Sequence, residues 1–349
     1  MAKLWEVTQF NVRTSARDST SDSLFANGQM QVKVIVSIKA FLLDPDENGN
    51  SDYQLTKAEL EGIKLINYYS RNELTGRWTY STTENGFAHV LPRAGAPVDP
   101  IADGTQTIGF WVSSTQITNE NIAAQISQPG KDKPTTVTTT GGIFDSMVTL
   151  EAIQPVTYTT DNVSFTREDT AEGTWRIQTG SNSSTYRWDQ DNYYVSSHDY
   201  PFLKVDRHQV DTTGNDNGVV RSSDMQDSFA YLKAGKNDIS IFYMFDVGKE
   251  MTVRRGLYTW SGSTTYYRYA QIKVNQRVNA LCLTRLLFFS GYTSWWNNWD
   301  ANAWFTIYDL YGNHGHFSVR TEGQNTLSFT SRNVRSPAEG TSVGRTVKI

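Results

Sequence analysis

Strict alternation of apolar and other side chains over residues 30–38, MQVKVIVSI, is the feature that most constrains this chain. A period of two is typical of a half-buried β-strand, whereas the apolar face of a helix repeats every three to four residues. Extended segments rich in β-branched and aromatic residues recur along the chain between turn-forming residues. The sequence therefore predicts an all-β protein. The side chains expected on the inner face of this strand are Met30, Val32, Val34, Val36 and Ile38.

One short helix is expected within the first half of the chain. Thr56 is followed three residues later by Glu59, which is the spacing of a capping box. Gly62 comes soon afterwards and limits the helix to two turns or fewer. The predicted fold is therefore two β-sandwich-like domains of mainly antiparallel strands, with at most one or two short helices.

The best domain boundary lies near residue 155, between a first run of strand candidates and a more aromatic second half. A sandwich of about seven strands over about a hundred residues is a common size for one domain. The expected organisation is an N-terminal arm over residues 1–24, a β-sandwich over 25–155, a larger aromatic-rich β domain over 156–330, and a C-terminal arm over 331–349.

Charge and composition restrict the partners and the compartment. The 32 basic and 36 acidic side chains give a net charge of −4, so nucleic acid is not expected as a partner. Cys282 is the single cysteine and has apolar neighbours, which predicts a buried thiol and no disulfide. The first residues lack the apolar segment of a signal peptide, and the most apolar run is too short to cross a bilayer. We expect a protein that is cytoplasmic as synthesised, and a role outside the cell would require release by lysis or through a dedicated machine.

Four of the ten tryptophans lie in residues 294–305, SWWNNWDANAWF. Trp304 begins a regularly alternating segment and is expected in a strand. The residues before it lack alternation and are rich in Asn and Asp, which predicts a loop. Such a loop closes a core as a lid, binds another protein, or binds a glycan or membrane surface. The candidate ligand or interface residues are Trp295, Trp296, Asn297, Asn298, Trp299 and Asp300.

Both ends of the chain combine a strand-like segment with a polar tether. Eleven extended residues reach about 36 Å, far enough to contact a neighbouring molecule. An arm that pairs with the open edge of a neighbour's sheet satisfies backbone groups that the edge leaves free, and the basic C-terminal arm is the favoured donor. The alternative is an arm folded onto its own domain. The apolar residues expected to anchor the arms are Trp5, Val7, Val343, Val347 and Ile349.

The acidic segment DPDENGNSD begins like an EF-hand calcium loop. Asp44, Asp46 and Asn48 occupy its first three ligand positions. The twelfth position is Leu55, so no carboxylate closes the site. These residues are weak calcium candidates, and the favoured interpretation is an acidic hairpin loop with neither metal nor cofactor.

His314 and His316 lie two residues apart, with Asp309 nearby. Two imidazoles on one face of a strand can hold a metal with a third ligand. Gly315 and the preceding Tyr-Gly-Asn favour a turn at this position instead.

The function classes follow from these observations. Asp189, Asp191 and Asp300 are carboxylates that a glycoside hydrolase could use, but no catalytic motif accompanies them. We expect a non-enzymatic, bacterial-type structural protein that assembles with itself through strand edges and aromatic contacts, as an inclusion, sheath or tail-type component. The alternatives are a surface- or glycan-binding module or toxin component that recognises a host surface, and a glycoside hydrolase.

Overall fold

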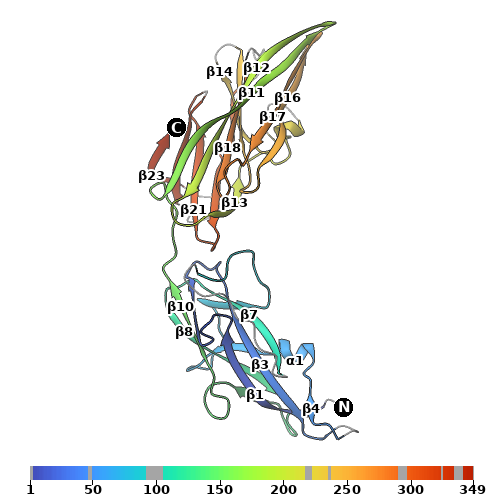
Figure 1. Ribbon diagram of the computed structural model, residues 1–349, viewed down its shortest axis with the longest axis vertical. Helices are drawn as coiled ribbons and strands as arrows, with labels where there is room; N and C mark the ends of the chain where they lie inside the picture. Colours follow the sequence, from blue (N-terminus) through green and yellow to red (C-terminus); the bar gives the residue numbers. More distant parts are fainter. Residues whose placement is uncertain are drawn as a thin grey trace. The chain divides into compact units, whose positions relative to one another are not determined.

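The computed structural model confirms the predicted fold class, because sheets dominate both halves of the chain (Figure 1). Within the described part of the chain, one short α-helix and one 3-10 turn accompany the strands. None of the helical segments described there has the length and apolarity needed to cross a membrane. The structure describes residues 3–45, 49–91, 105–216, 222–234, 237–289, 297–323, 325–333 and 341–348.

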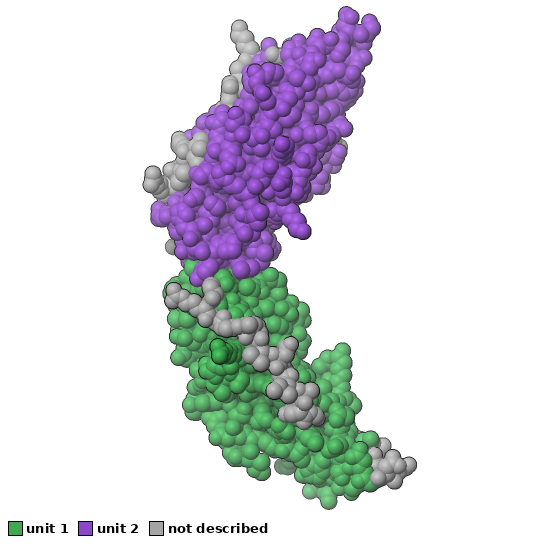
Figure 2. Space-filling model, viewed as in Figure 1, with its two compact units in different colours: residues 1–156, 311–313 green, residues 157–310, 314–349 purple. Residues whose placement is uncertain are grey.

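The chain divides into two compact units (Figure 2). The first comprises residues 1–156 together with 311–313, and the second comprises residues 157–310 together with 314–349. Each unit has its own sheets and its own buried side chains.

Two five-stranded sheets form the first unit. The strands of one sheet, in spatial order, are β1 (Trp5–Thr14), β3 (Val32–Leu42), β7 (Gln106–Ser114) and β6 (Trp78–Ser81), with β4 (Asp52–Tyr53) on β3. Those of the other are β2 (Ser21–Phe25), β10 (Val148–Ile153), β8 (Asn119–Gln128) and β5 (Lys64–Asn67), with β9 (Thr135–Thr138) on β8. Strand β2 runs parallel to β10, in contrast to the antiparallel pairs beside it.

The alternation over residues 30–38 has the predicted inner face. Its five apolar side chains, from Met30 to Ile38, are fully buried. Ile35 and Ser37 on the opposite face are buried as well, so β3 is more deeply enclosed than a strand with one solvated face. Lys33 remains half-exposed and lies 5.5 Å above the Trp111 ring.

Of the two interpretations of the N-terminal segment, an arm that reaches a neighbour and an arm folded onto its own domain, the structure fits the second, because β1 forms part of the first unit. It pairs along almost its whole length with β3. Trp5 is buried, and its Nε1 donates a 2.8 Å hydrogen bond to Oε1 of Glu59. Val7 is half-buried, and its backbone N–H donates to the side chain of Gln128. The apolar side chains that suggested an intermolecular anchor are used in the chain's own core.

Helix α1 (Lys57–Glu61) has the predicted capping box. Thr56 Oγ1 accepts from the Glu59 N–H at 3.3 Å, and Glu59 Oε2 accepts from the Thr56 N–H at 2.7 Å. The same carboxylate also binds Trp5, so one side chain both caps the helix and ties it to β1.

The second unit contains an eight-stranded and a five-stranded sheet. The eight-stranded sheet consists, in spatial order, of β16 (Met251–Ser261), β17 (Thr264–Val274), β11 (Val163–Thr179), β12 (Asn182–Ser197), β18 (Leu281–Phe288), β15 (Asp238–Met244), β14 (Ser228–Ala234) and β19 (Trp299–Asp300). The five-stranded sheet consists of β13 (Phe202–His208), β20 (Trp304–Asp309), β21 (His314–Thr321), β22 (Leu327–Asn333) and β23 (Thr341–Lys348). The 3-10 turn η1 (Ser223–Met225) adds Met225 to the core.

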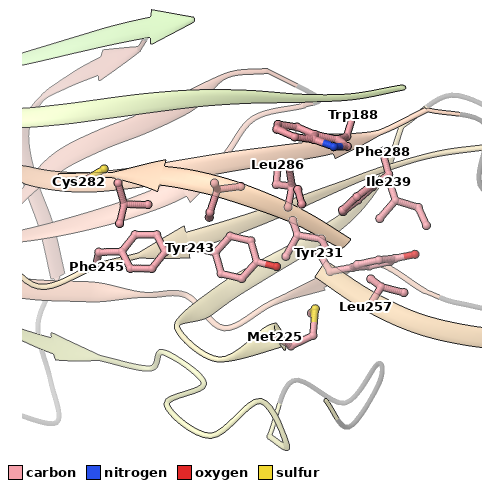
Figure 3. Close-up of a cluster of buried hydrophobic side chains, with 14 of the residues drawn as sticks. Trp188, Met225, Tyr231, Ile239, Tyr243, Phe245, Leu257, Cys282, Leu286 and Phe288 are labelled. Carbon is pink, nitrogen blue, oxygen red and sulfur yellow. The ribbon is translucent and has the colours of Figure 1, made fainter. Parts of the chain in front are cut away.

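Buried rings and aliphatic side chains hold the eight-stranded sheet together (Figure 3). Tyr231, Tyr243 and Leu257 lie in one cluster, although they come from β14, β15 and β16. Cys282 belongs to the same cluster, and burial raises the pKa of its thiol to about 11, as expected for an unreactive thiol.

The C-terminal segment also departs from the sequence expectation of an arm that reaches a neighbour. Strand β23 pairs antiparallel with β22 of the same chain and forms the edge of the five-stranded sheet. The side of β23 that faces β22 is therefore paired within the chain. The side chains of Val343 and Val347 lie outside the part that the structure describes, as does Ile349 altogether.

Candidate functional site

The tryptophan-rich segment is described only from Asn297 onward, so Trp295 and Trp296 lie outside the described residues. Trp299 lies in β19 opposite Tyr231 of β14 and packs half-buried against the core cluster. Of the three interpretations of this segment, the position of Trp299 fits the core lid.

The polar neighbours of Trp299 are exposed, and two of them hold the segment in place. Asn298 Oδ1 accepts a 2.9 Å hydrogen bond from the backbone N–H of Lys233. Asp300 accepts from the Asn302 N–H and from the Thr321 hydroxyl. These contacts give Asn298 and Asp300 a structural use, while Asn297 is exposed.

The candidate metal ligands do not come together among the described residues. No group of three or more His, Cys, Asp or Glu side chains with metal-binding geometry occurs there. Asp44 is exposed, and Asp46 and Asn48 lie outside the described residues. His314 and His316 lie in strand β21, so the turn expected at these two residues is wrong, and their rings are 5.3 Å apart.

Two of the three carboxylates considered for a hydrolase, Asp189 and Asp191, are engaged in ion pairs. Asp191 is 1% exposed and pairs with Arg285 and, at 2.9 Å, with Arg167. Asp189 pairs with the same Arg285 at 3.0 Å. Both carboxylates therefore serve as partners of guanidinium groups within the sheet.

Two long hairpins form the most distinctive surface of the second unit. Strands β11 and β12 make one hairpin, and β16 and β17 make the other. Pairing of residues 176–179 in β11 with residues 264–267 in β17 joins them into one four-stranded sheet near their tips. Figure 1 shows the four strands running together to one end of the unit.

The outer face of this four-stranded sheet carries aromatic rings in register. Tyr258 lies opposite Tyr267, and Tyr267 lies opposite Arg176. Trp260 follows Tyr258 by two residues and therefore shares its face. The set, called the twin-hairpin face below, consists of Arg176, Gln178, Tyr258, Trp260, Thr265 and Tyr267.

The rings of the twin-hairpin face contact one another but remain open to solvent. Trp260 is 67% exposed and Tyr258 is 37% exposed. Of the tryptophans that the structure describes, Trp260 alone is exposed. The Tyr258 ring centroid lies 5.5 Å from that of Tyr267 and 6.2 Å from that of Trp260, and the Arg176 guanidinium lies 4.7 Å from the Tyr267 ring.

The opposite side of the same strands is the core. Trp175, Leu257 and Arg268 are buried there, and Arg268 lies between the rings of Trp175 and Tyr266 at 5.0 and 4.7 Å. Burial in these apolar surroundings lowers the pKa of Arg268 to about 10. The core fixes the strands, so the outer rings are presented on a rigid support.

Sequence reasoning missed the twin-hairpin face. The alternation of Trp175 and Ile177 with polar residues, and of Tyr258 and Trp260 with neighbours of mixed polarity, is present in the sequence. The tips contain Gly180 and Gly262 at φ 57°, which suits tight turns between long strands. These signals reveal two hairpins, but not that the hairpins pair with each other.

An exposed cluster of this composition is suited to binding rather than to bond breaking. Trp and Tyr rings offer large rigid contact areas with polar edges. Exposed aromatic clusters on a protein surface mark interaction sites. Gln178 and Thr265 provide amide and hydroxyl groups beside the rings, and Arg176 provides a cation.

Comparison with known proteins adds no family. No family model matches the chain, and the search of curated proteins finds no relative. Among solved structures, a chain described as BspA_C_mut is 9% identical, with 88% of this chain and 96% of that chain covered and a TM-score of 0.17. The C-terminal domain of the Streptococcus pyogenes antigen I/II-family protein AspA is 11% identical over the same shares, with a TM-score of 0.19. Likenesses this weak carry no argument about function.

Proposed function

We propose that the chain is a non-enzymatic recognition protein, whose twin-hairpin face binds sugar chains on another surface. The observation that carries this proposal is the exposure of Trp260 beside Tyr258 and Tyr267 on one face of a rigid sheet. Large exposed rings are costly to leave in water, so their grouping on one face points to a ligand.

The chemistry around the rings favours a sugar over an apolar protein surface. A sugar has C–H faces that stack on flat rings and hydroxyls that need hydrogen-bond partners. Gln178 and Thr265 lie opposite each other in the register, beside Trp260. A protein-binding patch has a more apolar centre with its polar groups at the rim.

The ion-paired carboxylates support the non-enzymatic part of the proposal. Hydrolysis of a glycoside requires one carboxyl group that is protonated and one that is free to attack or activate water. Asp191 is buried against two arginines, and Asp189 shares one of them.

The proposal is tested with the Trp260→Ala and Tyr258→Ala variants, alone and combined, on a glycan array followed by titration calorimetry. The double variant is expected to lose binding by about tenfold or more while its melting temperature stays close to that of the parent. Tyr69→Ala is the matched control, because Tyr69 is 71% exposed in the first unit. Failure of the parent to bind any glycan, or retention of binding by the double variant, contradicts the proposal.

Self-assembly remains a second candidate, and one observation favours it. Strand β16 is the edge of the eight-stranded sheet and extends over residues 251–261. A long edge strand offers unpaired backbone groups to a second sheet. Assembly of this kind would suit the inclusion, sheath or tail-type role that the sequence suggests. Light scattering of the full-length protein over a range of concentrations tests it, and a monomer at every concentration excludes this candidate.

A further inference from the structure

The outer surface of the five-stranded sheet gathers three of the chain's five histidines around one tryptophan. His208 of β13 lies opposite Trp304 of β20, and His316 of β21 lies opposite Thr306 of β20. Because alternate residues of a strand share a face, these side chains lie on the same side of the sheet. The set, called the histidine face below, consists of His208, Trp304, His314, His316 and Arg332.

Ring contacts tie the histidine face together. The His208 ring stacks on Trp304 at 3.6 Å between centroids, and the Arg332 guanidinium lies 4.3 Å from the same Trp304 ring. His316 Nδ1 lies 2.8 Å from Thr306 Oγ1. Trp304 is only 6% exposed, and Tyr308 on the same face is half-buried with its ring 5.5 Å from that of His314.

Basic groups exceed acidic groups on this face. Exposed Lys204 and Arg320 share it with Arg332. On the four described strands β13, β20, β21 and β22, Asp206 is the carboxylate on the outer side, and it pairs with Lys204 at 2.9 Å. Asp309 is buried on the inner side, where it accepts from the Tyr158 hydroxyl. The face is therefore cationic at neutral pH, in a chain whose net charge is −4.

Two nitrogen atoms of the histidine face have no hydrogen-bond partner among the described residues. They are Nε of Arg332 and Nδ1 of His314. Neither residue forms an ion pair with a described carboxylate. Both atoms are enclosed, so the cations that a ligand can reach on this face are the exposed Lys204 and Arg320 and the half-buried Arg332. Anionic oxygens are the strongest acceptors for such cations.

The surroundings of His208 and His316 lower the pKa of both imidazoles and so favour their neutral forms. Burial is the main cause that lowers the pKa of His316, and His314, Arg332 and His208 lower it further. Burial and Arg332 also lower the pKa of His208, while Asp206 opposes this. An anion placed among these groups favours their protonated forms, so its binding takes up protons.

We propose that the histidine face binds a sulfated or uronate-bearing polysaccharide, and that binding tightens as the solution becomes mildly acidic. An extended chain with repeated anions can contact Arg332, His316 and His208 along the sheet. A bilayer is less suited to this face, because Trp304 is buried and Tyr308 is half-buried with Lys204 5.2 Å from its ring, so no large ring is exposed there among the described residues. The proposal concerns a different surface from the twin-hairpin face and does not depend on it.

Titration calorimetry of full-length protein with heparin as the probe tests the proposal. The parent is expected to bind about tenfold more tightly at about pH 5.5 than at about pH 7.5, because protonation adds cations to the face. The His208→Gln/His316→Gln variant is expected to lose most of this difference between the two pH values. His198→Gln is the matched control, because His198 is exposed in the same unit and lies outside the four strands.

Proton uptake provides a measurement that does not depend on how well a variant folds. Binding of heparin to the parent is measured in two buffers with different ionisation enthalpies, and net proton uptake is expected near pH 6. Binding without uptake, or no heparin binding at the lower pH, overturns the proposal. Histidine-dependent binding to phosphatidylserine vesicles or to duplex DNA in preference to heparin also overturns it, because the partner would then be of another class.

Discussion

The sheet that β11, β16 and β17 form carries aromatic side chains on both of its faces, with opposite consequences. On the inner face, Trp175 is 3% exposed and packs with Phe288 and the Arg268 guanidinium. On the outer face, Trp260 is 67% exposed and contacts only its neighbour Tyr258 among the described rings.

The inner rings of this sheet contribute to its stability, whereas the outer rings are available for recognition. A residue that is surrounded loses many contacts when it is truncated, whereas an exposed ring loses few. Burial rather than residue type therefore decides which tryptophan supports the fold, and the outer rings can change without loss of the strands.

The largest difference in the free energy of unfolding is expected between truncation of Trp175 on the inner face and truncation of Trp260 on the outer face. Trp175→Ala is expected to lower the free energy of unfolding by about 3–5 kcal/mol, through lost burial and a cavity. Trp260→Ala is expected to change it by no more than about 0.5 kcal/mol. Urea unfolding monitored by far-UV circular dichroism compares them, and similar losses for both variants would break the distinction between the two faces.

Breaking a buried ion pair should likewise lower the free energy of unfolding more than breaking an exposed one. Asp191→Asn removes a carboxylate from the buried Arg285, and the expected loss is about 3 kcal/mol. Glu172→Gln removes an exposed pair with Arg187, and the expected loss is below about 1 kcal/mol. The two unfolding free energies are compared at low and high salt. Only the effect of Glu172→Gln should shrink with salt, and equal losses would contradict this prediction.

Two glycines of the β16–β17 hairpin sharpen the comparison further. Gly256 has φ 137°, and a Cβ there would lie 1.8 Å from the Arg268 carbonyl oxygen on the neighbouring strand. Gly256→Ala is therefore expected to cost about 1–3 kcal/mol through strain and displacement of β16. Gly262 in the turn has φ 57° with no atom within 4 Å of such a Cβ, so Gly262→Ala is expected to cost about 1 kcal/mol. If Gly262→Ala lowers the free energy of unfolding more than Gly256→Ala does, the close contact between β16 and β17 at Gly256 is not the stronger constraint on the hairpin.

The smallest expected effect is a pH dependence of the second unit. The pKa values of His208 and His316 are lowered in the folded state, chiefly by burial. The unfolded chain therefore binds protons first, and the stability that the neutral imidazoles contribute is fully present above about pH 6.5. It decreases as the pH falls from there through the lowered values. The melting temperature of the parent should be lower at about pH 5.5 than at about pH 7.5, and this difference should be smaller in the His208→Gln/His316→Gln variant. A difference of the same size in the variant would mean that other groups cause it.

The sequence predicted the elements whose pattern is local. The inner side of β3 follows from its period of two, and the cap of α1 follows from Thr56 and Glu59 alone. Burial of Cys282 follows from its apolar neighbours. In each case the residues that decide the structure lie within a few positions of one another.

Features that depend on long-range pairing could not be predicted in this way. Trp5 was expected to anchor an arm, but its partner Glu59 lies 54 residues away. Likewise, Arg176 and Tyr267 meet only because β11 pairs with β17. The alternation of a strand indicates which side chains share a face, but it does not indicate which strand lies beside it.

The parallel pairing of β2 with β10 has a consequence for the order of events during synthesis. Strand β2 leaves the ribosome early, yet its partner lies at residues 148–153, near the end of the first unit. The edge of β2 that pairs with β10 therefore has no partner until almost the whole unit has been translated. Contacts between segments so far apart in sequence form slowly. We expect nascent chains that stop before residue 148 to expose this edge to chaperones, and chains that extend past residue 156 to bury it.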